Sequence, residues 1–301
     1  MGYAETRYNI ERNPEIKEQE PDVRVPLVDI VRHGDTDYKE LRDPSFKFDP
    51  QALDFKLDAE HLDLNEQGIE NILQTAMQLC QSIDKEKEVV MLVSSPNYRA
   101  QSSILLIEKI LQENGIDVLN SSAAKQAGAS KGIRLVGNLR QIEQRDSNFN
   151  PTWSAEDKKY REEDPQRQKI SAREAHTEIA ARLGKTVPEI FTRDHDQLDL
   201  DFRKWLRHMI NIDQNFDEKT KKVIAGRRIR LICATHEEVP EKFMQEALGV
   251  EGNLAKGQVM EINAQNKLSP GEKTAAQVSL FEKGEARGAQ GKISISYDKK
   301  E

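Results

Sequence analysis

Short apolar runs alternate along the chain with longer segments in which apolar residues recur every three or four positions. The runs at 23–31, 88–95 and 227–235 have strand length and are apolar on both faces, which is typical of buried parallel strands. Helical spacing lies between and after these runs, at 69–83, 104–111, 202–210 and 243–248. This order predicts a three-layer α/β/α sandwich with a mostly parallel sheet.

The pattern changes toward the end of the chain. A strand is expected at 258–263, and 133–143 is expected to be extended. Apolar positions at 277–281 and 292–297, separated by a glycine-rich turn, predict an extra C-terminal hairpin over about 274–298.

Three charged, proline-bearing segments break the alternation. Residues 1–22 are expected to form an N-terminal extension to a single domain over 23–301. The stretches at about 39–62 and 144–200 are expected to be insertions in that domain. Three aromatic side chains of the first insertion either line a substrate mouth or pin the insertion to the core: Phe46, Phe48 and Phe55.

The composition agrees with one domain that carries long charged segments. The chain has 301 residues, of which 37% are hydrophobic, and its mean hydropathy is −0.74. Lysine and arginine total 45 against 52 aspartates and glutamates, and the net charge of −7 argues against a general nucleic-acid-binding protein. No apolar run reaches the length of a membrane span, and the N-terminus lacks the apolar stretch of a secretion signal.

The two cysteines, Cys80 and Cys233, both lie in apolar periodic segments and are expected to be buried free thiols. We therefore expect a cytoplasmic protein with neither nucleic-acid nor membrane partners. The pattern does not indicate an oligomeric state.

Three of the predicted strands each end in a cluster of polar residues. The clusters are Arg32-His33-Gly34-Asp35-Thr36, residues 94–101 with Arg99, and Thr235-His236-Glu237. Because the carboxyl ends of parallel strands lie at one edge of a sheet, two arginines and two histidines are expected to converge there. Arginine binds phosphate oxygens in a bidentate manner and stays charged. Ser95-Pro96 is expected to begin a helix whose first amides add to this positive field.

A histidine in such a pocket can carry a phosphoryl group, because a neutral imidazole attacks phosphorus directly. Arg32, Arg99 and His236 would then stabilise the charge on the phosphoryl oxygens. A carboxylic acid must protonate the departing alkoxide, and water attacks the phosphohistidine in a second step. The expected partner is a small phosphorylated substrate. No metal or other cofactor is expected, because the arginines supply the positive charge.

Four motifs in this order resemble those of the histidine phosphatase superfamily, which includes the phosphoglycerate mutases. The motifs are Arg32-His33-Gly34-Asp35-Thr36 (Arg-His-Gly-x-Thr/Ser), 64–68 (Leu-x-x-x-Gly), 94–101 (Ser-Ser-x-x-x-Arg-Ala-x-Gln, here with Gln101 directly after Ala100) and Thr235-His236 (Ser/Thr-His). The resemblance covers about 25–265. It implies a phosphoglycerate mutase-like fold, with His33 as the nucleophile and a phosphate pocket made of Arg32, Arg99 and His236.

The resemblance leaves the proton donor open. Many phosphatases of the superfamily have Leu-Arg-Glu-Ile, in which the Glu is the donor, whereas here Gln141 stands in its place and cannot act as an acid. Glu143, two residues on, lies on the same face of a strand, and a bulge would bring it to the site. Glu237 is the alternative, because the phytase branch carries its donor directly after the second histidine. Glu143 is the favoured donor.

These observations predict a phosphomonoester hydrolase that acts through a phosphohistidine on His33. The alternatives are a phosphoglycerate-mutase-type phosphotransferase and a non-catalytic protein that binds a phosphorylated ligand or serves as a scaffold. The mutase element Glu-Arg-His-Tyr-Gly is absent from the sequence. The other histidines lie in or near the insertions and are expected to be solvated: His61, His176, His195 and His208. The acidic run at 194–201 is likewise expected to be solvated rather than to bind a metal.

Overall fold

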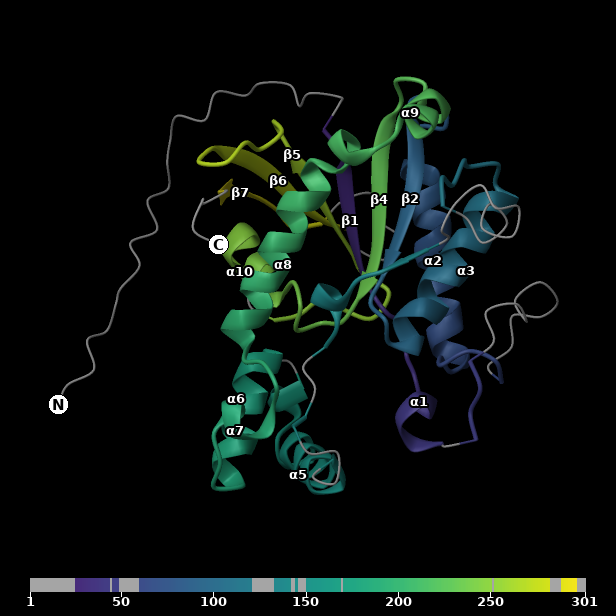
Figure 1. Ribbon diagram of the computed structural model, residues 1–301. Coiled ribbons are helices and arrows are strands. Elements are labelled where there is room, and N and C mark those ends of the chain that lie inside the picture. The colour runs from purple at the N-terminus through teal and green to yellow at the C-terminus, as the bar shows by residue number, and fades with distance from the viewer. Residues whose placement is uncertain are drawn as a thin grey trace.

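The computed structural model of the chain describes residues 25–43, 45–48, 60–120, 133–141, 144–145, 150–168, 170–250, 252–281 and 288–296. The expected extension over 1–22 lies outside these residues, as do Phe55 and Glu143. Within them, a sheet with helices on both faces forms the body of the protein, and a group of helices projects from one end (Figure 1).

The body contains, in the described residues, a seven-stranded sheet with the order β3-β2-β4-β1-β5-β6-β7. Its strands are Leu27–Arg32 (β1), Glu88–Ser94 (β2), Arg134–Leu135 (β3), Arg228–Thr235 (β4), Val259–Ala264 (β5), Lys273–Phe281 (β6) and Gln290–Ser296 (β7). The first four are parallel to one another, and β5, β6 and β7 continue the sheet beyond β1 in antiparallel pairs. The predicted α/β fold is confirmed.

The register of the parallel strands brings the three polar clusters together. Arg32 of β1 pairs with Thr235 of β4, and Ser94 of β2 pairs with Ala234 of β4. The chain therefore leaves all three strands at the same edge of the sheet, within about one residue of the same level. This is the edge at which open α/β sheets bind ligands.

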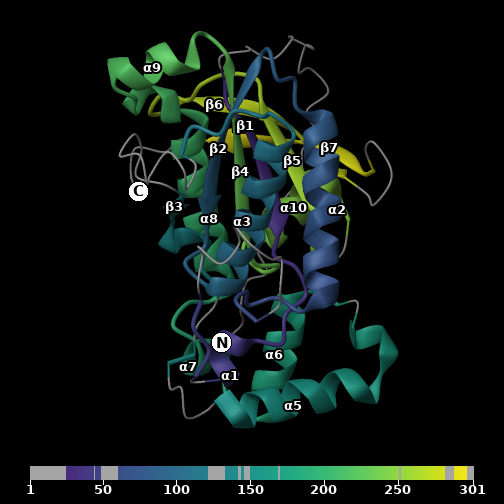
Figure 2. The same ribbon diagram turned by 90° about the vertical axis from the view of Figure 1, so that its right-hand side faces the viewer.

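Helices cover both faces of these strands, which is why the strands are apolar on both faces. One face is covered by α2 (Glu66–Ser82) and α3 (Tyr98–Glu113), and the other by α8 (His195–Ile210) and α10 (Glu241–Leu248) (Figures 1 and 2). Two short helices, α1 (Lys39–Arg42) and α9 (Glu218–Ile224), lie outside these layers, and single 3₁₀ turns occur at Gly137–Leu139, Pro165–Gln168 and Ile212–Asn215. None of the helices in the described residues is long and apolar enough to cross a membrane.

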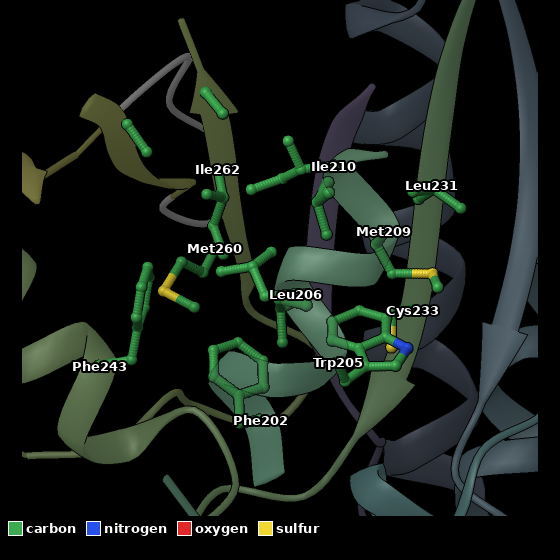
Figure 3. Close-up of a cluster of buried hydrophobic side chains, with 14 of the residues drawn as sticks. Phe202, Trp205, Leu206, Met209, Ile210, Leu231, Cys233, Phe243, Met260 and Ile262 are labelled. Atoms are coloured by element: carbon green, nitrogen blue, oxygen red, sulfur yellow. The ribbon is translucent and has the colours of Figure 1, made fainter. Parts of the chain in front are cut away.

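The apolar residues that recur every three or four positions in α8 are buried against one face of the sheet (Figure 3). The cluster includes Phe202, Trp205, Leu206, Met209, Ile210, Leu231, Cys233, Phe243, Met260 and Ile262. Burial of one large apolar side chain contributes roughly 1.5–3 kcal/mol, so this face is a main source of stability. Cys233 is a buried free thiol here, whereas Cys80 on α2 is a free thiol that is only half-buried.

The projecting helices, together with the first turn of α8, form what we call the helical lobe, which is described over residues 150–168 and 170–198. They are α5 (Asn150–Glu163), α6 (Ala172–Arg182) and α7 (Val187–Ile190), and they lie at the end of the body where the parallel strands end (Figure 1). The lobe has its own apolar cluster around Trp153, Tyr160 and Ile179. Its charged residues pair with each other, as in the bonds from Arg167 and Arg182 to Glu163 at 2.7 and 2.8 Å, so this charged segment folds despite its weak apolar period.

Candidate active site

His33 is the first residue after β1, and its own loop fixes the orientation of its ring. Nδ1 lies 2.7 Å from the carbonyl oxygen of Gly34, and because a carbonyl only accepts hydrogen bonds, Nδ1 carries the proton. Nε2 is therefore the nitrogen with the free lone pair, and Nε of Arg99 donates to it at 3.3 Å. His33 is 5% exposed, so its ring is buried at this edge of the sheet.

The loop that carries His33 is pressed against the start of α2. A Cβ atom on Gly34 would lie 2.5 Å from the carbonyl oxygen of Gly68, and one on Gly68 would overlap the backbone of Asp35. The amide of Gly34 also donates to Oγ of Ser103 on α3 at 3.1 Å. Gly34 and Gly68 are therefore both required, because the two backbone segments come too close together for a Cβ atom. This close contact fixes the position of the loop that carries His33.

Arg99, in the first turn of α3, is the buried cation of the site, with 0% of its surface exposed. Besides its bond to His33, its Nη2 donates to Oε1 of Gln141, and its Nη1 lies 3.7 Å from Oε2 of Glu40. The ring of Tyr38 lies 5.4 Å from its guanidinium carbon. A buried charge is costly unless it is paired, so these contacts explain how Arg99 is held beside His33.

His236 follows β4 and lies against His33, with 5.1 Å between the ring centroids. Its Nε2 lies 2.9 Å from Oγ of Ser95, which itself donates to Oδ1 of Asn97 at 3.0 Å. Ser95 is thus occupied at the site and does not cap the helix. The helix α3 begins at Tyr98 with Asn97 as its N-cap residue, two residues later than the sequence predicts.

Arg32, at the end of β1, is held from two sides. Its Nη1 donates to the carbonyl oxygen of Leu254 at 2.7 Å, and its Nη2 lies 2.5 Å from Oε2 of Glu237. This second contact engages the carboxylate that the sequence offers as an alternative proton donor. Arg32 and Glu237 therefore form an ion pair at the edge of the pocket.

Three buried polar atoms of the site have no hydrogen-bond partner among the described residues: Arg32 Nε, Arg99 Nη1 and His236 Nδ1. Buried polar groups in folded proteins are normally bonded, so several such atoms in one pocket point to a polar ligand. Two of the three belong to cations. A ligand that satisfies them is an oxyanion.

Electrostatics keep both imidazoles neutral. Burial and the positive charge of Arg99 lower the pKa of His33 well below its ordinary value, and Arg32 and Lys256 act in the same direction. Burial and Arg99 also lower the pKa of His236. A neutral imidazole is the form that can attack phosphorus.

The structure brings His33, His236, Arg32 and Arg99 together, as the sequence predicts, and adds residues that sequence reasoning missed. Glu40 and Tyr38 reach Arg99 from the segment at α1, whose polar composition has no periodicity. Gln141 also lies at the site, in contact with Arg99. Glu143 lies outside the described residues.

The segment that contains α1 and continues through residues 45–48 packs on the body and also borders a cavity. Phe48 stacks on Tyr98 with 4.8 Å between the ring centroids, and Phe46 meets the same ring edge-on at 6.4 Å. A cavity of about 700 Å³ beside them is lined by Lys39, Asp43, Ser45, Phe46, Lys47, Glu60 and His61. Phe46 and Phe48 therefore pack this segment against Tyr98 of α3, and Phe46 also borders the cavity.

The expectation that the other histidines are solvated is wrong for His195, which is 6% exposed. Its Nε2 lies 3.1 Å from Nδ1 of His176, inside the helical lobe. The carboxylates of the acidic run are engaged elsewhere: Asp194 caps α8, Asp196 pairs with Arg173 at 2.9 Å, and Asp199 with Arg203 at 2.9 Å.

Comparisons with known proteins match this fold at low similarity. A scan against profiles of known families finds no match, and a search of curated proteins finds none. The solved structures that match include a mycobacterial glucosyl-3-phosphoglycerate phosphatase, with 15% sequence identity, a TM-score of 0.40, and coverage of 79% of this chain and 91% of that chain. A phytase from Klebsiella sp. ASR1 matches with 11% identity, a TM-score of 0.35, and coverage of 87% and 84%.

These matches concern the fold alone. At these identities and TM-scores the likeness decides nothing about activity or substrate. The functional assignment therefore rests on the side chains of the site itself.

Proposed function

We propose that the protein hydrolyses phosphomonoesters through a phosphohistidine on His33. The observation that carries the proposal is the neutral imidazole of His33, whose Nδ1–H is bonded to Gly34 and whose Nε2 faces the buried guanidinium of Arg99. A phosphoryl group that binds to Arg99 is therefore placed next to the lone pair of Nε2. The contact that binds the phosphoryl group also positions it for attack.

The reaction has two steps, transfer of the phosphoryl group to His33 and hydrolysis of the phosphohistidine. In the first, Nε2 of His33 forms a bond to phosphorus, the bond from phosphorus to the alkoxide oxygen breaks, and a carboxylic acid protonates that oxygen. In the second, water attacks phosphorus, the nitrogen–phosphorus bond breaks, and the carboxylate accepts the proton of the water. Arg32, Arg99 and His236 stabilise the charge on the phosphoryl oxygens throughout.

Bound phosphate acts on the two imidazoles in different ways. Nδ1–H of His33 is held by Gly34, so Nε2 is the nitrogen whose lone pair attacks phosphorus. His236 has a buried Nδ1 without a hydrogen-bond partner in the described residues, and the negative charge of a phosphate raises its pKa and favours a proton there. His236 then donates to a phosphoryl oxygen, which supports a binding rather than a nucleophilic role.

One observation favours the second candidate, a protein that binds a phosphorylated ligand without turning it over. Gln141 replaces the family's acid and contacts Arg99. An amide can orient the guanidinium, but it cannot protonate a leaving group. Without another acid at the site, the pocket would bind phosphate and hydrolyse only esters with good leaving groups.

The test is a hydrolysis screen over a panel of phosphomonoesters with the wild type and His33→Ala, combined with rapid quench of labelled substrate. The wild type is expected to form an acid-labile, base-stable phosphoenzyme, and the variant neither to form it nor to turn over. Wild-type turnover in His33→Ala would overturn the mechanism. Transfer of the label to a second hydroxyl instead of water would identify a phosphotransferase, and binding without a phosphoenzyme would identify a binding protein.

A further inference from the structure

Hydrolysis of an alkyl phosphate needs an acid beside the leaving oxygen, and the described residues place several carboxylates around the pocket. Asp35 contacts Lys256 and accepts a hydrogen bond from Asn71 at 2.9 Å. Glu237 lies 2.5 Å from Arg32. Each of these two carboxylates is thus in direct contact with a cation of its own, and neither is free to face a substrate without breaking that pair.

Glu40 is placed differently. Its Oε2 accepts a hydrogen bond from the backbone amide of Tyr98 at 3.0 Å and lies 3.7 Å from Nη1 of Arg99. The second distance is too long for a hydrogen bond, so Glu40 is near the phosphate-binding guanidinium without being bound to it. Arg99 reaches His33 through Nε and faces Glu40 through Nη1, so one guanidinium lies between the nucleophile and this carboxyl group.

The segment that carries Glu40 is held in place from two sides. Tyr38, just before α1, has a left-handed backbone with φ of 57°, which is unfavourable for a tyrosine, and its ring lies on Arg99. The amide of Glu40 is also 3.4 Å from Oδ1 of Asp63 in the loop before α2. Glu40 itself is 22% exposed, so its carboxyl group can exchange protons with water.

The pKa of the Glu40 carboxyl group lies above its ordinary value, and burial is the main cause. Burial raises its pKa and the negative charge of Asp63 acts in the same direction, while the amide of Tyr98 and the cations Arg99 and Arg140 oppose them. The net direction is upward. A phosphate dianion on Arg99 adds negative charge nearby and raises the pKa further.

We infer that Glu40 is the general acid that protonates the leaving oxygen of the substrate, an inference that rests on the proposed hydrolysis through His33. As Nε2 of His33 bonds to phosphorus, the bond to the leaving oxygen breaks and that oxygen takes the proton of the Glu40 carboxyl group. The resulting carboxylate accepts a proton from the water that attacks the phosphohistidine, which restores Glu40 for the next turnover. Glu40 thereby supplies the acid that Gln141 cannot.

The test compares Glu40→Gln with the wild type on two substrates, glycerol 2-phosphate and p-nitrophenyl phosphate. An alkoxide needs protonation, whereas nitrophenolate is stable without it, so kcat/KM should fall about 10²–10⁴-fold on the alkyl ester. On the aryl ester the loss should stay below about tenfold. Glutamine keeps the oxygen that accepts from Tyr98, so the variant is expected to fold, and Glu40→Asp should recover part of the alkyl activity.

Glu238 follows Glu237, and burial raises the pKa of its carboxyl group as well. Three matched variants, Glu143→Gln, Glu237→Gln and Glu238→Gln, therefore identify a different donor if one exists. A selective loss on the alkyl ester in any of them, with Glu40→Gln near the wild type, overturns the inference. Equal losses on both esters in Glu40→Gln also overturn it, because they assign Glu40 to the positioning of Arg99. A wild type that forms phosphoenzyme from the aryl ester but never hydrolyses the alkyl ester overturns it while leaving the proposed function intact.

Discussion

Two pairs of neighbouring histidines occur at the same ring separation in the described residues; His33, His236 and His195 are buried, and His176 is half-buried. The rings of His33 and His236 lie 5.1 Å apart at the edge of the sheet, and those of His176 and His195 lie 5.1 Å apart in the helical lobe. In all four the pKa is lowered, and burial is the largest cause each time. A close pair of imidazoles with lowered pKa values is therefore common to both regions.

The surroundings of the two pairs differ. Arg99 donates to the ring of His33, and the pocket contains buried cationic nitrogens that have no hydrogen-bond partner in the described residues. In the lobe, His176 is stacked on Phe191 at 5.1 Å and meets Trp153 edge-on at 5.4 Å. The surroundings of His33 attract an anion, whereas His176 is packed among aromatic side chains. Cations with unused donors, and not the imidazoles, distinguish a candidate site from a packed core.

The largest contrast is expected from removing one imidazole of each pair. His33→Gln deletes the proposed nucleophile and should reduce turnover by at least about 10³-fold, because a glutamine amide cannot form a phosphohistidine. His195→Gln should change turnover by less than about twofold. Steady-state rates with p-nitrophenyl phosphate, after confirmation of folding by circular dichroism, check the contrast. Comparable losses in both variants would mean that the lobe pair takes part in the reaction.

A smaller contrast is expected from removing one cation of each region. Arg99→Met should weaken the binding of inorganic phosphate about 10–100-fold, since hydrogen bonds to charged groups contribute roughly 1.5–3 kcal/mol. Arg182→Met removes a lobe guanidinium that lies 4.8 Å from the ring of Tyr160, and phosphate binding should not change. Titration calorimetry measures both affinities.

Arg99→Met also tests whether the charge of Arg99 controls the pKa of His33. Because the charge of Arg99 lowers the pKa of His33, Arg99→Met should raise that pKa, which ¹³C NMR of labelled histidine can follow. An unchanged phosphate affinity in Arg99→Met would show that the anion binds elsewhere, whatever happens to His33.

The sheet and its candidate site could be predicted because both leave local signals. Apolar runs mark the strands, parallel strands end at one edge, and the polar clusters stand directly after them, so His33, His236, Arg32 and Arg99 were identified from spacing. The start of α3 was misplaced because Ser95-Pro96 has the composition of a cap, while the structure uses the hydroxyl of Ser95 to hold His236.

The contacts made by the charged segments could not be predicted. Glu40 reaches Arg99 across a sequence separation that no periodicity signals, and the lobe folds around ion pairs and a small aromatic cluster instead of a long apolar stripe. His195 was expected in water because its neighbours Asp194 and Asp196 are acidic. Those carboxylates instead cap a helix and pair with Arg173, which leaves the imidazole facing inward.

The smallest contrast concerns stability in mild acid. Burial lowers the pKa of His176 to about 3 and that of His195 to about 4, against about 6.5 in an unfolded chain. Below pH 6.5 the unfolded chain binds protons that the folded lobe does not, so the stability from this pair is fully present above pH 6.5 and is lost as the pH falls toward 4.

For one such histidine the loss between pH 6.5 and pH 5 is roughly 2 kcal/mol, which corresponds to several degrees in Tm. His195→Gln removes one titrating group from the pair and should flatten the dependence of Tm on pH over this interval. Trp153 touches His176, so its fluorescence in a Trp205→Phe background reports the lobe directly. Saturating phosphate separates the two regions, because it stabilises the site around His33 at each pH and leaves the acid sensitivity of the lobe signal in place. An unchanged slope in His195→Gln would show that the lobe pair titrates as if exposed, and the likeness between the two pairs would then be geometric only.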